Sequence, residues 1–196
     1  MNKVSAVLIA GLLLLVIGCA TPGKNYYAAP APEIQQAVQT KDSSFDTDTS
    51  FIGPALSTGT HDIGFGTWTL IRSWRDKKTQ KVTHQIYVNN HYVSSGWRYY
   101  WSANFEGGVE AKFNEVNREV RWCNAGSGCD YEEIFGVDVD DKQLRAAIAT
   151  GIRFRANAKS GNTLIVEIPP TYIEGYMAAV DGKPLPVSPT KPQVGQ

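Results

Sequence analysis

Short segments in which apolar and polar residues alternate dominate this chain. In one segment the apolar positions are Trp97, Tyr99, Trp101, Ala103 and Phe105, and in another they are Ile152, Phe154, Ala156 and Ala158. A period of two is typical of a β-strand with one buried face. The second segment is followed by the turn Ser160-Gly161-Asn162 and by alternating Leu164, Val166 and Ile168, which predicts a β-hairpin.

Similar alternation recurs along the chain and is interrupted by two helical patterns. Further strands are expected around residues 68–74, 82–88, 109–113, 120–122 and 131–139. Asp140 or Asp141 can cap a short helix that Gly151 closes, and Pro170 can begin a second helix that ends at Gly182. About eight strands with antiparallel turns and two short helices predict a mainly β fold, either a β-sandwich-like domain or an open barrel.

The first twenty residues have a different pattern. Lys3 precedes an almost unbroken apolar run from Val4 to Ile17, which is shorter than the ~20 residues that span a bilayer as a helix. A basic residue, a short apolar run and then small residues are typical of a secretory signal peptide. The segment Val16-Ile17-Gly18-Cys19 resembles the lipobox of bacterial lipoproteins. The alternatives are a plain secretory signal with an incidental cysteine, or a core helix.

The lipobox resemblance implies where the protein is held. Residues 1–18 would be removed as a signal peptide, and Cys19 would carry a diacylglycerol and an amide-linked acyl chain such as palmitate. Two or three acyl chains anchor a protein firmly to a membrane. We therefore expect a lipid-anchored protein of the cell envelope. In a Gram-negative host, Ala20 after the cysteine favours the outer membrane, with the protein facing the periplasm.

Composition then divides the mature chain into three parts. Residues 19–50 contain four prolines or glycines early on and a polar stretch without period, which predicts a flexible tether after the lipidated cysteine. Residues 51–183 hold the strand patterns and are expected to form a single β-rich domain. The proline-rich residues 184–196 predict a disordered tail.

The two cysteines outside the lipobox favour a disulfide. Cys123 and Cys129 flank the turn-forming segment Asn124–Gly128, and an envelope compartment is oxidising. A reactive or metal-binding pair is the alternative, but the spacing matches neither a redox motif nor a zinc site.

The charge balance and the sequence motifs limit the partners, cofactors and enzyme classes to be expected. The 19 basic and 19 acidic residues balance, so nucleic acid is not an expected partner. The acidic segment 138–141 lacks the glycine and spacing of a calcium loop and is better explained as a helix cap. No zinc-hydrolase, nucleophile-elbow or phosphate-loop motif is present. We expect no metal or cofactor, and a binding protein is favoured over an enzyme.

Outward-facing aromatic and basic residues define a candidate binding surface. If Ile86 and Trp101 face the core, Tyr87 and Tyr100 face outwards. By the same alternation Arg98, Arg153, Arg155 and Lys159 also face outwards. One of the adjacent acids Glu132 and Glu133 is expected to face inwards, where it would need a partner such as an arginine. The candidate surface comprises Tyr87, Arg98, Tyr100, Glu132, Arg153 and Arg155. Aromatic rings can stack on sugars and arginine can bind carboxylates or hydroxyls; the alternative is an ordinary soluble strand surface.

Three functions fit these features. The leading hypothesis is a membrane-anchored, non-enzymatic envelope lipoprotein that binds or scaffolds another envelope component, possible partners being another envelope protein or a glycan. The second is a glycan-binding or glycan-processing domain. The third is an inhibitor of a hydrolase, with residues 124–128 as the inhibitory loop.

Overall fold

The computed structural model describes residues 24–58, 65–124, 126 and 128–186. They form two antiparallel sheets and three helices, which confirms the predicted mainly β, sandwich-like fold with short helices; the described strands do not close into a barrel. The predicted signal peptide and Cys19 lie outside the described residues.

The larger sheet, called here the large sheet, contains seven strands. Its order is β1 (Gln39–Lys41), β2 (Asp48–Ile52), β4 (Gly66–Asp76), β5 (Val82–Ser94), β9 (Gly128–Val139) and β8 (Phe113–Asn124), with β3 (Leu56–Thr58) paired to β4. The small sheet has the order β11 (Thr163–Ile168), β10 (Ile152–Ala158), β6 (Tyr100–Phe105) and β7 (Glu110–Ala111). The predicted hairpin is β10–β11, with Ile152 opposite Ile168.

The helices are α1 (Ala31–Ala37), α2 (Asp141–Ala146) and α3 (Pro170–Asp181), and a 3₁₀ turn spans Glu106–Gly108. Both predicted helices are confirmed. The Asp140 side chain accepts a hydrogen bond of 2.7 Å from the backbone N of Gln143 and so caps α2. Gly182 ends α3 with a φ of 67°, in the left-handed region. None of the helices in the described part of the chain is long and apolar enough to cross a membrane.

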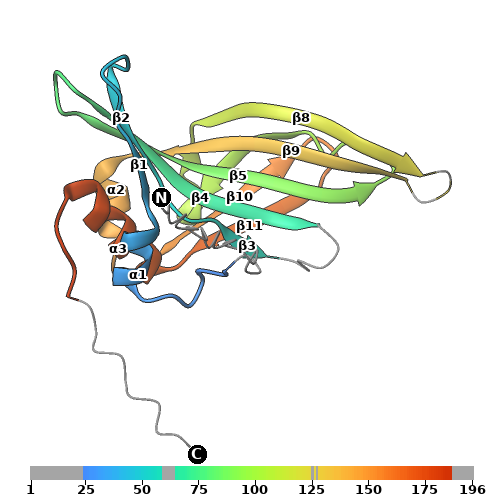
Figure 1. Cartoon of the computed structure of the whole chain (residues 1–196). Coiled ribbons are helices and arrows are strands. Elements are labelled where there is room, and N and C mark those ends of the chain that lie inside the picture. Colours follow the sequence, from blue (N-terminus) through green and yellow to red (C-terminus); the bar gives the residue numbers. More distant parts are fainter. Residues whose placement is uncertain (1–23, 59–64, 125, 127, 187–196) are drawn as a thin grey trace, which may run out of the picture.

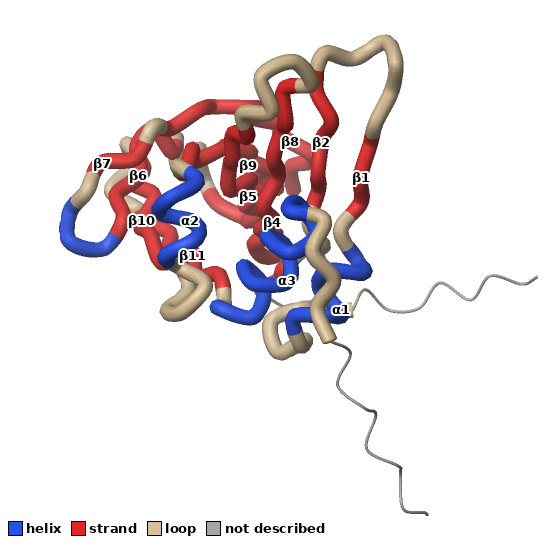
Figure 2. Tube along the Cα trace, turned by 90° about the vertical axis from the view of Figure 1, so that its left-hand side faces the viewer, coloured by secondary structure: helices blue, strands red, loops and turns tan. Residues whose placement is uncertain are grey.

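The core lies on the inner face of the large sheet. The small sheet packs on one half of this face and helix α3 on the other. The small sheet covers the β5–β9–β8 half, where the rings of Tyr100 and Phe135 lie 5.3 Å apart. Helix α3 covers the β2–β4 half, where the Tyr176 hydroxyl donates to the backbone O of Phe51 at 3.2 Å. The three helices gather at one end of the molecule, and the β8–β9 hairpin projects at the other (Figure 1). Figure 2 looks onto the helical end, with α2 and α3 in front of the sheets.

The folded domain begins well before residue 51, so the predicted tether has to be corrected. Ile34 in α1 is completely buried, and α1 packs against α3 so closely that a Cβ on Gly175 would overlap the backbone O of Ala31. The segment after α1 supplies β1 and β2 to the large sheet. Sequence patterns alone showed no partner for Ile34 because that partner, α3, lies some 140 residues later in the chain.

The predicted boundary of the tail at residue 184 has to be corrected. The backbone N of Leu185 donates to the Gln35 side chain at 2.9 Å, and the same side chain donates to the backbone O of Lys183 at 2.6 Å. These bonds attach the start of the segment to α1. Residues 187–196 lie outside the described residues.

Candidate binding surface

The six residues of the predicted surface do not form one surface. Tyr87 lies half-buried on the outer face of the large sheet, where the Arg72 guanidinium sits 4.4 Å from its ring centroid. Arg153 and Arg155 are exposed on the outer face of the small sheet, which is the opposite side of the sandwich. These three side chains therefore cannot contact one compact ligand.

The prediction that Tyr100 faces outwards is wrong. It is 1% exposed and faces the core, whereas Trp101, expected to be buried, is 56% exposed. The cause is a β-bulge in β6: Tyr100 pairs with Ala158 and Ser102 pairs with Asn157, so Trp101 is an extra residue between the two pairs. A bulge interrupts the two-residue alternation and reverses which side chains face inwards.

Tyr99, just before the bulge, is also exposed and has an unusual backbone. Its φ of 58° lies in the left-handed region, which an aromatic residue rarely adopts, and its side chain is 43% exposed. Trp97 lies beside it, with ring centroids 6.0 Å apart. We call Trp97, Tyr99 and Trp101 the aromatic platform. Sequence alternation had assigned all three to the core.

A buried carboxylate holds the platform in place. Glu133 on β9 is 1% exposed. Its two oxygens accept hydrogen bonds from the backbone N atoms of Arg98, Tyr99 and Tyr100, each at 3.0 Å. Three consecutive amides that converge on one carboxylate fix the chain in the strained turn that precedes β6.

Side chains complete the bonding of this carboxylate. The Tyr92 hydroxyl donates to Glu133, and the Nε of Arg118 donates to it at 3.1 Å. Arg118 also donates to the backbone O of Tyr100 at 2.8 Å and lies 5.2 Å from the Tyr99 ring centroid. The expectation that an inward-facing acid would pair with an arginine is therefore met by Glu133 and Arg118.

Arg98 was expected to face solvent, but it is turned towards the protein. Its guanidinium lies over the Tyr92 ring at 3.9 Å and donates to the Asn90 side chain at 3.0 Å. Below the platform, the Tyr131 ring contacts Trp97 at 4.6 Å and Tyr92 at 5.6 Å, measured between centroids. Stacked rings of this kind support the platform from the inside.

Glu132 lies on the opposite face of β9 from Glu133. It accepts a bond of 2.6 Å from the Asn89 side chain and one of 3.3 Å from the Arg121 guanidinium. As expected for neighbours in a strand, the two carboxylates face opposite sides of the sheet and cannot act on one substrate as an acid and base pair.

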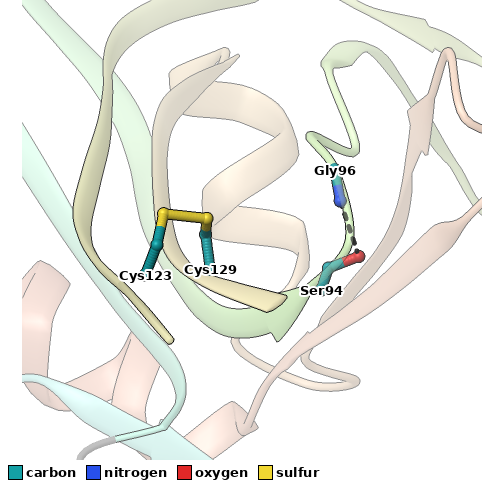
Figure 3. Close-up of a disulfide and its surroundings, with 4 residues drawn as sticks. All are labelled: Ser94, Gly96, Cys123 and Cys129. Carbon is teal, nitrogen blue, oxygen red and sulfur yellow. Dashed lines mark hydrogen bonds between the residues drawn. A yellow bond between two sulfur atoms is a disulfide. The ribbon is translucent and has the colours of Figure 1, made fainter. Parts of the chain in front are cut away.

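The disulfide is present as predicted. Cys123 and Cys129 are joined directly opposite each other at the end of the β8–β9 hairpin (Figure 3). Cys129 also pairs with Ser94 of β5, whose hydroxyl accepts a bond of 3.4 Å from the backbone N of Gly96. The disulfide thus joins the ends of β8 and β9 beside the end of β5, and the chain runs from β5 into the aromatic platform. Two residues of the enclosed loop, 125 and 127, lie outside the described residues.

A second polar cluster resembles a catalytic arrangement only in its residue types. Ser73 Oγ lies 2.7 Å from His84 Nδ1, and His84 Nε2 lies 3.1 Å from an oxygen of Asp141. Burial lowers the pKa of His84, and the hydrogen bond from Arg145 lowers that of Asp141. Ser73, however, is completely buried and its hydroxyl also contacts the Tyr176 hydroxyl at 2.6 Å under α3. A serine sealed in this way cannot attack a substrate.

An open groove of about 880 Å³ lies beside this cluster and includes the acidic segment 138–141. Burial would raise the pKa of Asp138, but hydrogen bonds from Gln85 and Lys112 outweigh it and lower the pKa. In the described part of the chain, no group of three or more metal-binding side chains converges. His61, the histidine beside Asp62, lies outside the described residues.

Comparison with known proteins identifies no relative: no family model, no curated protein and no solved structure matches this chain. The fold and the aromatic platform therefore define only a class, an antiparallel β-sandwich-like domain with the exposed aromatic residues Tyr99 and Trp101 at the start of β6.

Proposed function

We propose that the protein is a membrane-anchored, non-enzymatic component of the cell envelope that binds another envelope component through the aromatic platform. The lipobox supports the anchor, because acyl chains on Cys19 would hold the chain at a membrane. The single observation that carries the binding role is the exposure of Tyr99 and Trp101 on a backbone that the buried Glu133 fixes.

The composition of the platform supports this role. Tyrosine, tryptophan and arginine dominate the few residues that carry most of the energy of protein interfaces. Exposed aromatic residues that are already held rigidly lose little conformational entropy on binding. The platform offers Tyr99 in this form, with the Arg118 guanidinium against its ring.

The position of the platform supports a tethered role as well. Asn25 donates to the backbone O of Ser57 at 3.4 Å, and Tyr27 donates to the backbone O of Glu167 at 3.2 Å. The start of the described chain is thereby attached to β3 and β11, away from the projecting tip of the β8–β9 hairpin (Figure 1). An anchor preceding these residues leaves the hairpin end free for a partner.

Crosslinking of the full-length protein in the cells that produce it tests the proposal. We expect a reproducible partner that is lost when Tyr99 and Trp101 are both replaced by alanine. Trp122→Ala is the matched control, because Trp122 is 49% exposed but lies on the other face of the hairpin. If no partner is captured, or if the control loses it equally, the proposal is wrong.

Membrane fractionation tests the anchor separately. The protein should leave the membrane fraction when Cys19 is replaced by serine, and mass spectrometry should show acyl chains on the wild type. A wild-type protein that is fully soluble and unmodified would contradict the anchor.

A further inference from the structure

The outer face of the small sheet carries a row of uncharged polar groups next to Trp101. The Asn157 side-chain amide on β10 donates to Ser102 Oγ at 3.1 Å and to Asn104 Oδ1 at 3.0 Å, both on β6. This leaves the Asn157 oxygen, the Asn104 amide hydrogens and the Ser102 hydroxyl hydrogen without a partner in the described part of the chain. The row therefore presents both donors and acceptors to solvent.

Two neighbours extend this row. Trp101 immediately precedes Ser102 and is 56% exposed at the bulge. At the other end, Arg155 lies directly opposite Asn104 in the strand pairing and makes no ion pair with any described residue. A shallow hollow of about 260 Å³ includes both Asn104 and Arg155 in its lining.

The charges on and beside this face cancel. The basic residues are Arg153, Arg155 and Lys159, and the acidic residues are Glu106, Glu110 and Glu167, three of each sign. A face without net charge does not attract an acidic polymer or an anionic membrane over a distance. It suits a ligand that is itself uncharged and is recognised through hydrogen bonds and ring stacking.

We propose that this face binds an uncharged glycan chain. One sugar ring stacks on the indole of Trp101, because the faces of sugar rings are apolar and pack on aromatic side chains. Hydroxyl or acetamido groups of the same and the next sugar bond to Ser102, Asn104 and Asn157, and Arg155 donates to a further hydroxyl. The inference rests on the proposed binding function and names the chemical class of the ligand at the Trp101 side of the platform.

Titration of the full-length protein in lipid nanodiscs tests this assignment. The probes are an oligosaccharide of N-acetylglucosamine and a glucose oligosaccharide of the same length without acetamido groups. Calorimetry measures the affinity, and fluorine NMR of fluorotryptophan-labelled protein shows which of the five tryptophans responds. We expect binding of at least one probe, with a shift of the signal that Trp101→Phe removes or displaces.

Variants then place the site. Trp101→Ala and Asn157→Ala should each weaken binding by about tenfold or more, the loss expected for one ring stack or one paired polar group. Arg155→Ala alters only an exposed side chain and should weaken binding without changing the fold. Trp122→Ala, at the other exposed tryptophan, should leave the affinity unchanged.

Three results would overturn the glycan assignment: neither oligosaccharide binds, the Trp101 signal does not respond, or Trp122→Ala weakens binding as much as Trp101→Ala. The crosslinking experiment separates this failure from failure of the proposed function. If a protein partner is captured through Tyr99 and Trp101 while no glycan binds, the binding function stands and the glycan assignment falls. If neither partner nor glycan is found, both fall.

Discussion

Replacing Glu133 with glutamine should destabilise the protein far more than the same change at the adjacent Glu132. Glu133 is 1% exposed, and one of its oxygens accepts two backbone N–H groups and the Tyr92 hydroxyl. The other oxygen accepts one backbone N–H and the Nε of Arg118. A carboxylate only accepts at this position, whereas a glutamine must place an NH₂ group against donors.

The cost follows from counting these donors. If the NH₂ group takes the place of Oε2, the amide of Tyr100 and the Nε of Arg118 lose this acceptor. If it takes the place of Oε1, the amide of Tyr99 and the Tyr92 hydroxyl lose theirs, whereas the Arg98 amide keeps its bond of 2.9 Å to the Tyr92 hydroxyl. Each buried donor left unpaired costs about 1–3 kcal/mol. The Arg118 side chain is 21% exposed, so water partly compensates it. We therefore expect Glu133→Gln to lower the free energy of unfolding by about 3–5 kcal/mol.

Glu132→Gln is the matched control. Its Asn89 partner can turn its amide over, and its Arg121 partner is 50% exposed, so the expected loss is about 1 kcal/mol or less. Urea denaturation followed by tryptophan fluorescence measures both variants. A loss below about 1 kcal/mol for Glu133→Gln, or equal losses for the two variants, would refute a supporting role of Glu133 beneath the platform.

Three further predictions concern other parts of the fold. Ile34→Ala should lower the free energy of unfolding by about 2–4 kcal/mol if α1 belongs to the core. Phe45→Ala, at a residue 97% exposed, should change it by about 0.5 kcal/mol at most. Equal effects of the two variants in urea denaturation would contradict the assignment of α1 to the core. Replacing Cys123 and Cys129 by serine should lower the free energy of unfolding by about 2 kcal/mol. The urea midpoint of this variant should be lower than that of the wild type, and a reductant should no longer change it. Burial lowers the pKa of His84 below 6.5, so the unfolded chain takes up this proton at a higher pH than the folded chain does. Stability should therefore fall as the pH drops below about 6.5, and His84→Gln should flatten that part of the profile measured by thermal unfolding.

Local rules predicted the parts of the fold that depend on local interactions. The β10–β11 hairpin follows from alternation and from the turn at 160–162, and both lie within seventeen consecutive residues. The cap at Asp140 and the stop at Gly182 depend on backbone groups within one helical turn. The disulfide followed from compartment and parity, and its partners are six residues apart.

Interactions between distant segments could not be read in the same way. The burial of Ile34 requires α3, and the His84 cluster joins Ser73 to Asp141, 68 positions along the chain. Strand order likewise depends on which apolar faces meet. Periodicity reports how a segment alternates but not which other segment covers it.

The reversal at the platform has a different origin and bears on function. Burying Trp101 in a regular strand would contribute about 2–3 kcal/mol, yet the bulge leaves its side chain 56% exposed. The left-handed φ of Tyr99 adds a cost of about 1–3 kcal/mol. Glu133 offsets these costs with bonds to three successive amides, so a buried carboxylate stabilises a turn that places Tyr100 in the core and leaves Tyr99 and Trp101 exposed. Violations of local preference that distant residues support are expected where a surface is held ready for a ligand. The turn and bulge at residues 99–101 interrupt the alternation pattern, and they also expose the aromatic residues that are proposed to bind a partner.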